Sequence, residues 1–157
     1  MREGLKKKAD KIRPKMSYDL FIKGRYSESQ LRKIVAGSLE IDANSIGNLY
    51  DLGPERDVNI DVDYLDGDFT TRLSVYKSDD LRPTLKEIDF AIDVSVNLKE
   101  IVMITYWDDN PFFWITIQPN GEIHKVQEIP NEREKFIQIN QFLQEKLELE
   151  EIRPMLK

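Results

Sequence analysis

Residues 57–77 carry the pattern that most constrains how this chain can fold, because apolar and polar residues alternate along two consecutive segments. In the first segment the apolar residues are Val58, Ile60, Val62 and Tyr64, with Asp or Asn between them. Alternation with a period of two places the apolar residues on one face of a β-strand. Asp66-Gly67, between the two segments, is typical of a tight hairpin turn. The sequence therefore predicts a β-hairpin with one buried face and one acidic face.

The predicted turn also fixes the register of this hairpin. If Asp66 and Gly67 are the two loop residues, both strands agree on which face is buried. The expected pairs on that face are Val58 with Val75, Ile60 with Leu73, Val62 with Thr71 and Tyr64 with Phe69. On the acidic face, Arg72 is expected opposite Asp61 as the only internal counterion. A slip by one residue would expose every apolar side chain, so the register is well specified.

The composition suits a single globular domain. The chain has 157 residues, of which 40% are hydrophobic and 33% charged, and this length allows a sizeable core. No apolar run approaches the roughly 20 residues that a membrane span needs, and the amino terminus lacks the apolar region of a secretory signal. The chain has no Cys, which excludes disulfides and thiolate chemistry. We expect a cytoplasmic protein that does not contact membranes.

Charge is distributed unevenly along the chain. Residues 1–15 carry seven Lys or Arg against two acidic residues, a net charge of +5, whereas the whole chain carries −6. Residues 16–157 therefore carry −11, which disfavours nucleic-acid binding by this domain and favours a basic protein partner. We interpret residues 1–15 as a basic extension outside the core. It is either a disordered or loosely helical leader or a basic arm that touches a nucleic acid or an anionic surface, and Met16 is an alternative start of translation.

The amino-terminal half of the domain is expected to begin with a strand and a capped helix. Residues 18–23 alternate as a strand does and stop at Gly24. Ser27 and Gln30 have the spacing of a capping box, and Tyr26 and Leu31 that of a hydrophobic staple. The following apolar spacing predicts a helix to about residue 40. Residues 46–52 suggest a short strand before the hairpin.

The carboxyl-terminal half contains one ambiguous segment, residues 85–98. Its apolar residues alternate as in a strand, but helical spacing is also present, and a strand of that length would exceed the usual ~3–10 residues. We favour a helix, followed by a strand at about 101–107. Residues 112–118 and 123–129 are expected to pair as a hairpin around residues 119–121.

A closing helix is predicted from Asn131 to near Pro154. Its apolar stripe would consist of Phe136, Ile139, Phe142, Leu143 and Leu147. The predicted fold is thus a single α+β domain over residues 16–157. It has a largely antiparallel sheet, a capped amino-terminal helix, a middle helix and a carboxyl-terminal helix packed on the sheet.

The acidic row of the hairpin is the first candidate site. A calcium loop is disfavoured because Val62 occupies the sixth position, where such a loop needs Gly, and because a strand spreads the carboxylates over about 20 Å. Two interpretations stay open, a solvated face and a surface that docks a basic partner, because like charges on one face repel unless something offsets them. The residues predicted for partner binding are Asp57, Asp61, Asp63, Asp66 and Asp68.

The second candidate site is an aromatic cluster around an acidic turn. It comprises Trp107, Asp108, Asp109, Phe112, Phe113 and Trp114. The aromatic side chains either alternate into the core on both sides of a covered sheet or leave one or two exposed as binding anchors. We include Trp107, Asp108 and Asp109 in the predicted partner-binding surface.

No set of catalytic residues is recognisable. His124 is the only His, and without Cys it would need a Ser, Asp or Glu partner from elsewhere in the chain. The seven glycines form neither a phosphate-binding loop nor a dinucleotide fingerprint. We therefore expect no enzymatic activity, no cofactor and no metal site.

With these segments placed, the chain resembles the small acidic immunity proteins encoded beside bacterial polymorphic and contact-dependent-inhibition toxins. The resemblance is carried by residues 18–24 with the capped helix from Ser27, and by residues 109–117 with Pro119-Asn120-Gly121. It covers about half of the chain and contains no catalytic motif.

This resemblance implies a non-enzymatic protein that binds one toxin domain, often a basic nuclease, and blocks it. It also favours the helix at residues 85–98. We therefore predict an immunity protein that neutralises a cognate basic toxin through its acidic surface. The alternative is a structural or adaptor subunit that uses the same surface for assembly.

Overall fold

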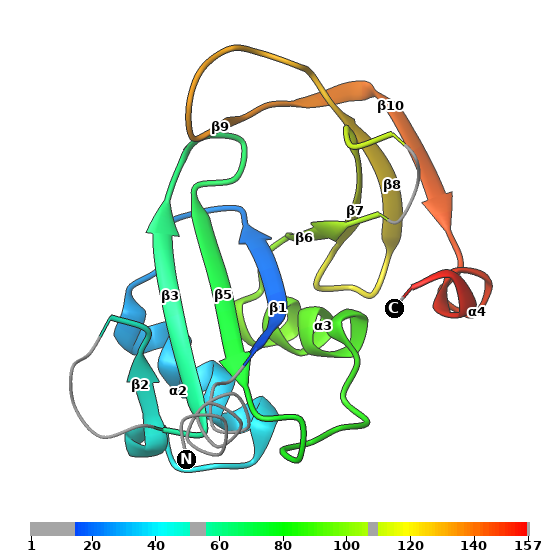
Figure 1. Ribbon diagram of the computed structural model, residues 1–157. Coiled ribbons are helices and arrows are strands. Elements are labelled where there is room, and N and C mark those ends of the chain that lie inside the picture. Colours follow the sequence, from blue (N-terminus) through cyan, green and yellow to red (C-terminus); the bar gives the residue numbers. More distant parts are fainter. Residues whose placement is uncertain (1–14, 51–55, 107–109, 157) are drawn as a thin grey trace, which may run out of the picture.

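The computed structural model describes residues 15–50, 56–106 and 110–156 and contains one large mixed sheet (Figure 1). In spatial order the strands are β10-β8-β7-β6-β1-β5-β3-β2. Their bounds are β1 Lys15–Ile22, β2 Ile46–Asn48, β3 Val58–Tyr64, β5 Thr71–Lys77, β6 Val102–Thr105, β7 Phe113–Ile117, β8 Ile123–Glu128 and β10 Ile139–Leu147. Two short segments, β4 (Asp66–Gly67) and β9 (Phe136–Ile137), pair separately. The prediction of a single α+β domain is confirmed.

Helix α2 (Glu28–Leu39) begins where the sequence predicts. The backbone N–H of Gln30 donates to Ser27 Oγ at 3.2 Å, and the backbone N–H of Ser27 donates to Gln30 Oε1 at 3.0 Å. This reciprocal capping box satisfies two N–H groups that a helix start leaves unpaired. The helix ends at Glu40 in the left-handed conformation. A short 3₁₀ helix, η1 (Ala43–Ser45), then leads to β2, which pairs parallel with β3.

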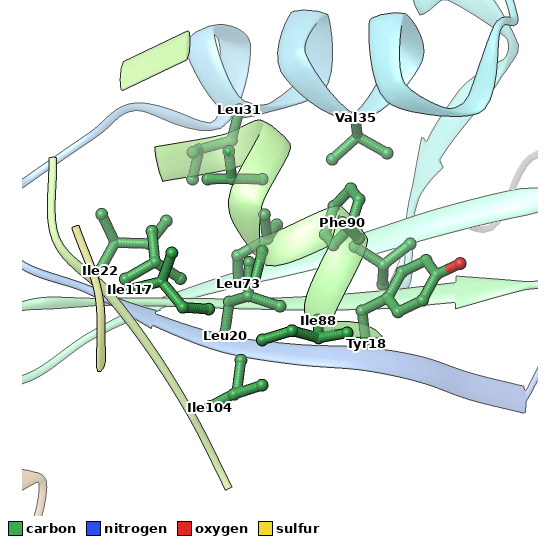
Figure 2. Packing of buried hydrophobic residues seen from close by; sticks show 14 of the residues in the cluster. Tyr18, Leu20, Ile22, Leu31, Val35, Leu73, Ile88, Phe90, Ile104 and Ile117 are labelled. Atoms are coloured by element: carbon green, nitrogen blue, oxygen red, sulfur yellow. The ribbon is translucent and has the colours of Figure 1, made fainter. Parts of the chain in front are cut away.

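The ambiguous segment is a helix, α3 (Glu87–Leu98). Phe90, Ala91 and Val94 are buried, and these helical positions lie in the main core. Phe90 stacks on Tyr18 of β1 with ring centroids 4.4 Å apart. Figure 2 shows Phe90 between α2 and the strands, with Val35 close to it. Both helices therefore cover the same face of the sheet, and α3 contacts β1, β6 and β7.

The hairpin of β3 and β5 forms, but its predicted turn is wrong. Val58 pairs with Lys77, and Ile60 with Val75, so each β3 residue pairs with the β5 residue two positions later than predicted. Because the shift is an even number, each side chain keeps its predicted face. Asp66–Gly67 does not close the hairpin and instead pairs parallel with Phe136–Ile137. Pairing with this segment, about 70 residues later in the sequence, therefore outweighs the local preference of Asp66-Gly67 for a tight turn.

The predicted carboxyl-terminal helix is also wrong. Residues 139–147 form strand β10 on the edge of β8, and only one helical turn, α4 (Leu149–Ile152), and a 3₁₀ turn, η2 (Arg153–Met155), follow. Ile137 and Ile139 are buried with a period of two, whereas Phe142 is 94% exposed. A helix would have buried these residues together but would have left the edge of β8 without backbone partners. Pairing with β8 therefore overrides the helical spacing.

Two apolar clusters lie on opposite faces of the sheet. The main core fills the space between the sheet and α2 and α3 (Figure 2). The second cluster lies on the other face, where the segment around β9 crosses it. Its buried members are Phe21, Phe69, Met103, Val126, Ile137 and Ile139. Within the described residues, no helix combines the length and the apolar character that crossing a membrane requires.

Candidate partner-binding surface

The candidate surface, here called the open face, is the side of β3, β5 and β1 opposite to α2 and α3. Strand alternation places its side chains there, because their neighbours Leu20, Ile60 and Leu73 point into the main core. Register aligns the residues in cross-strand rows. The rows are Asn59, Tyr76 and Met16; Asp61, Ser74 and Asp19; and Asp63, Arg72 and Phe21.

A bidentate ion pair lies at the centre of the open face. Arg72 Nε donates to Asp19 Oδ1 at 2.9 Å, and Arg72 Nη2 donates to Asp19 Oδ2 at 2.8 Å. Ser74 Oγ donates to the same carboxylate at 3.2 Å. The hydrogen bonds to Asp19 raise the pKa of Arg72. Arg72 is thus committed to Asp19 on β1 and does not neutralise Asp61, contrary to the sequence-based expectation.

Asp63 has a partner that the sequence did not indicate. Lys135 Nζ lies 3.1 Å from Asp63 Oδ2 and donates to Oδ1 at 3.2 Å. This hydrogen bond is the main reason why the pKa of Asp63 is lowered. Both side chains are substantially exposed, so water and salt screen the pair. Lys135 therefore offsets part of the negative charge that Asp63 adds to the surface.

Asp57 and Asp61 are the two aspartates of the open face without an ion-pair partner in the described part of the chain. Over residues 15–50, 56–106 and 110–156, no Lys or Arg forms an ion pair with either of them. Burial, followed by the charge of Asp61, raises the pKa of the neighbouring Tyr76. The end of the open face near the start of β3 thus combines negative charge with the half-buried Tyr76 and the exposed side chain of Met16.

One cation lies at the β2 edge of this surface. Arg56 Nη1 donates to the backbone oxygen of Asn44. Its side chain passes over Gly47, where an added Cβ would lie 2.8 Å from Arg56 Cδ and 2.6 Å from Asn59 Oδ1. Gly47 therefore leaves room for Arg56 and Asn59 to lie side by side, and a larger residue there would displace them.

The two remaining aspartates of the predicted set belong to the loop beyond β3. Asp66 is exposed, and its backbone N–H donates to Lys135 O at 2.8 Å. Asp68 Oδ2 accepts from the backbone N–H of Ile139 at 2.7 Å, which fastens the start of β10. Asp57, Asp61 and Asp63 thus share one side of the β3 segment, whereas Asp68 is already used inside the protein.

The aromatic cluster is divided between the two faces of the sheet. Trp114 packs edge-on against Phe21, with centroids 5.2 Å apart, in the second cluster. Phe113 faces the opposite way, and Lys125 Nζ lies 4.2 Å from its ring centroid. Phe112 is 37% exposed. The predicted binding residues Trp107, Asp108 and Asp109 lie outside the described residues.

A hollow that the sequence did not reveal adjoins Phe113. It has a volume of ≈ 350 Å³, and we call it the β10 hollow. Its lining residues are Phe113, Lys125, Val126, Gln127, Phe142, Leu143, Gln144 and Glu145. Sequence reasoning missed it because Phe142 and Leu143 fitted the stripe of the predicted helix. The strand spacing of Ile137 and Ile139 was the signal that pointed to the correct structure.

In the described part of the chain, the most strongly perturbed carboxyl group is Glu87, which sequence reasoning also missed. It begins α3, and its Oε2 accepts from the backbone N–H of Asp19 at 3.0 Å. β1 and β6 pair only at Phe21 and Ile22, so this N–H lies on the part of β1 that β6 does not reach. Burial raises the pKa of Glu87 from 4.5 to about 7.

His124 lies on β8 without a catalytic arrangement around it. Its Nε2 is 3.9 Å from Glu122 Oε2, and its Nδ1 has no hydrogen-bond partner in the described part of the chain. Over the same residues, no group of three or more His, Cys, Asp or Glu side chains is placed to hold a metal ion. Among the described residues, the features that stand out are therefore the open face and the β10 hollow.

Comparisons with protein-family models, with curated proteins and with solved structures find no match to this chain.

Proposed function

We propose that this protein is an immunity protein that binds a cognate, basic toxin domain one-to-one and neutralises it without enzymatic activity. The observation that carries the proposal is the open face, where Asp57 and Asp61 have no ion-pair partner among the described residues and Asp61 lies near Tyr76. A basic partner would supply the missing counter-charges. The net charge of −11 over residues 16–157 would attract such a partner from a distance.

The surface has two properties that suit tight binding. The Asp19–Arg72 pair is held by two hydrogen bonds, so this part of the face is ordered before a partner arrives. A preordered surface loses less conformational entropy on binding. Tyr76 and Met16 add apolar area at the same end of the sheet, and tyrosine is enriched among residues that dominate binding energy.

The function is tested with the protein encoded by the open reading frame immediately upstream, which the proposal expects to contain a toxic domain. Co-expression of this chain should protect cells from that domain, and the purified proteins should form a one-to-one complex by light scattering. Cells that die despite abundant folded protein, or the absence of a complex, would contradict the proposal.

The binding surface is tested separately by association kinetics. We expect that replacing Asp57, Asp61 and Asp63 by Asn slows association about tenfold at low ionic strength and flattens its salt dependence. The matched control replaces Glu148, Glu150 and Glu151 by Gln, which removes the same charge near β10, at the other end of the sheet. Equal slowing by both variants would show that only net charge matters and that the open face is not the docking site.

A further inference from the structure

The outer edge of β10 is a second surface, separate from the open face. β10 is nine residues long and is the terminal strand of the sheet beyond β8, whereas the opposite edge strand, β2, has only three residues (Figure 1). A terminal strand presents a row of backbone N–H and C=O groups that can pair with another strand. Residues 141–146 are all exposed, so nothing in the described chain covers this part of the edge.

Two apolar side chains of β10 are exposed to solvent beside this edge. Phe142 is 94% exposed and Leu143 is 53% exposed. A single exposed apolar residue is ordinary, but here two adjoin each other and line the β10 hollow of ≈ 350 Å³. The pairing register with β8 shifts between Ile139 and Gln144, which places both residues in an irregular part of the strand. This irregularity leaves Phe142 out of both apolar clusters.

The order of residues along β10 fits an identical strand running antiparallel to it. β10 is regular from Gln144 to Leu147. With the two-fold axis at Gln144, the side chain of Phe142 lies opposite Lys146 of the other copy, and Leu143 lies opposite Glu145. No two like charges face each other in this register. A centre one residue further along would place Glu145 opposite Glu145.

Side-chain chemistry supports the same arrangement. Lys146 would lie over the face of Phe142, where a cation is attracted by the ring. The aliphatic part of Glu145 would cover Leu143, and the side chains on that face would close over the hollow lined by Phe113. Because the pairing is symmetric, each contact forms twice.

We propose that two copies of this chain associate through their β10 strands, antiparallel and centred on Gln144, to form one continuous sheet. The association does not involve the open face, so it is independent of the proposed toxin partner. One strand pair with two apolar contacts is a small interface, so we expect a dissociation constant in the micromolar range.

Sedimentation equilibrium of the full chain tests the proposal. The wild type should change from monomer to dimer between about 5 and 500 μM. Phe142→Lys would place Lys opposite Lys146 twice and should weaken the dimer at least about tenfold. The matched control is Val96→Lys, at a 53% exposed position on α3, and should leave association unchanged. Circular dichroism should show that both variants keep the wild-type fold.

A compensating variant tests the register itself. Adding Lys146→Glu to Phe142→Lys would place Lys opposite Glu twice and should restore association to within about threefold of the wild type. A wild type that stays monomeric over the whole range would overturn the proposal. So would a dimer that Phe142→Lys does not weaken, that Val96→Lys weakens equally, or that the double variant fails to restore.

Discussion

In the half of the sheet formed by β1, β5, β3 and β2, the long strands β3 and β5 lie inside the sheet and its edge strand β2 is short. The half formed by β6, β7, β8 and β10 ends instead in a long and almost uncovered edge strand. Within the described residues, β1 and β6 share only two backbone pairings, Phe21 with Met103 and Ile22 with Val102, and the short β4–β9 pairing adds a second link between the halves. Helix α3 contacts strands of both halves. Because the backbone pairing between β1 and β6 is so short, buried side chains contribute more than a ladder of hydrogen bonds to holding the halves together.

The carboxyl-terminal segment reinforces this joint from outside. Ile152, in α4, is buried in the main core. Arg153 Nη2 lies 2.6 Å from Asp89 Oδ1, and Nη1 donates to Asp89 Oδ2 at 3.0 Å. The segment that follows β10 is thus anchored on α3, the helix that contacts both halves of the sheet. The exposed strand β10 is therefore fixed at its far end even though its own outer surface is uncovered.

Truncating a buried side chain of α3, the helix that contacts both halves, should have the largest effect. Phe90 has an exposed fraction of 0% and stacks on Tyr18. We expect Phe90→Ala to lower the free energy of unfolding by about 3–5 kcal/mol, because it removes buried apolar area and leaves a cavity. Phe142→Ala, measured at a protein concentration low enough to keep the chain monomeric, should change the free energy of unfolding by less than about 0.5 kcal/mol. Urea unfolding measures both values, and similar losses would contradict the division into a packed and an uncovered half.

Glu87, which binds the part of β1 that β6 does not reach, should make the stability of the protein depend on pH. The folded protein raises the pKa of Glu87 to about 7, so between its ordinary value and pH 7 the folded state holds a proton that the unfolded state has released. Stability from this group is therefore complete at low pH and falls as pH rises through this window. Glu87→Gln keeps an oxygen acceptor for the Asp19 N–H and removes the charge.

We expect Glu87→Gln to be more stable than the wild type by about 2 kcal/mol at pH 8 and equally stable near pH 4. Urea unfolding at several pH values measures the difference. Glu132→Gln, at an exposed position, should leave the pH dependence of stability unchanged. A constant difference between Glu87→Gln and wild type at all pH values would mean that the carboxyl group does not titrate in this window.

Sequence reasoning succeeded where the deciding interactions are local or periodic. The capping box of Ser27 and Gln30 spans three residues, and the faces of β3 and β5 follow from a period of two. The open face was located for the same reason. The charge balance of the open face was not predicted, because it depends on contacts between residues far apart in the sequence. Lys135 pairs with Asp63, 72 residues earlier, and Arg72 pairs with Asp19, 53 residues earlier.

The carboxyl-terminal segment shows why the other predictions failed. Phe136, Ile139, Phe142 and Leu143 fit a helical stripe, and the period of two at Ile137 and Ile139 is too short a signal to outweigh it. The open edge of β8 decides the outcome, and that edge exists only once the sheet has formed. The same holds for Asp68, whose role is set by the Ile139 N–H 71 residues away.

Gly67 offers the finest test of how the second half is attached to the first. Its φ is +100°, and an added Cβ would lie 2.1 Å from the backbone oxygen of Ile137. Gly67→Ala should therefore separate β4 from β9 and lower the free energy of unfolding by about 1–2 kcal/mol. Gly121→Ala is the matched control, since its φ of +91° carries the same backbone strain but nothing lies within 4 Å of its Cβ.

Hydrogen exchange should resolve where the change occurs. The amides of Asp68 and Ile139 donate to Ile137 O and Asp68 Oδ2, so Gly67→Ala should speed their exchange, whereas Gly121→Ala should not. Amides in α2 should respond only through the loss of global stability. If both variants lowered protection equally at Asp68 and Ile139, the effect would come from backbone strain, and close approach to Ile137 would not be what fastens β9 to the hairpin loop.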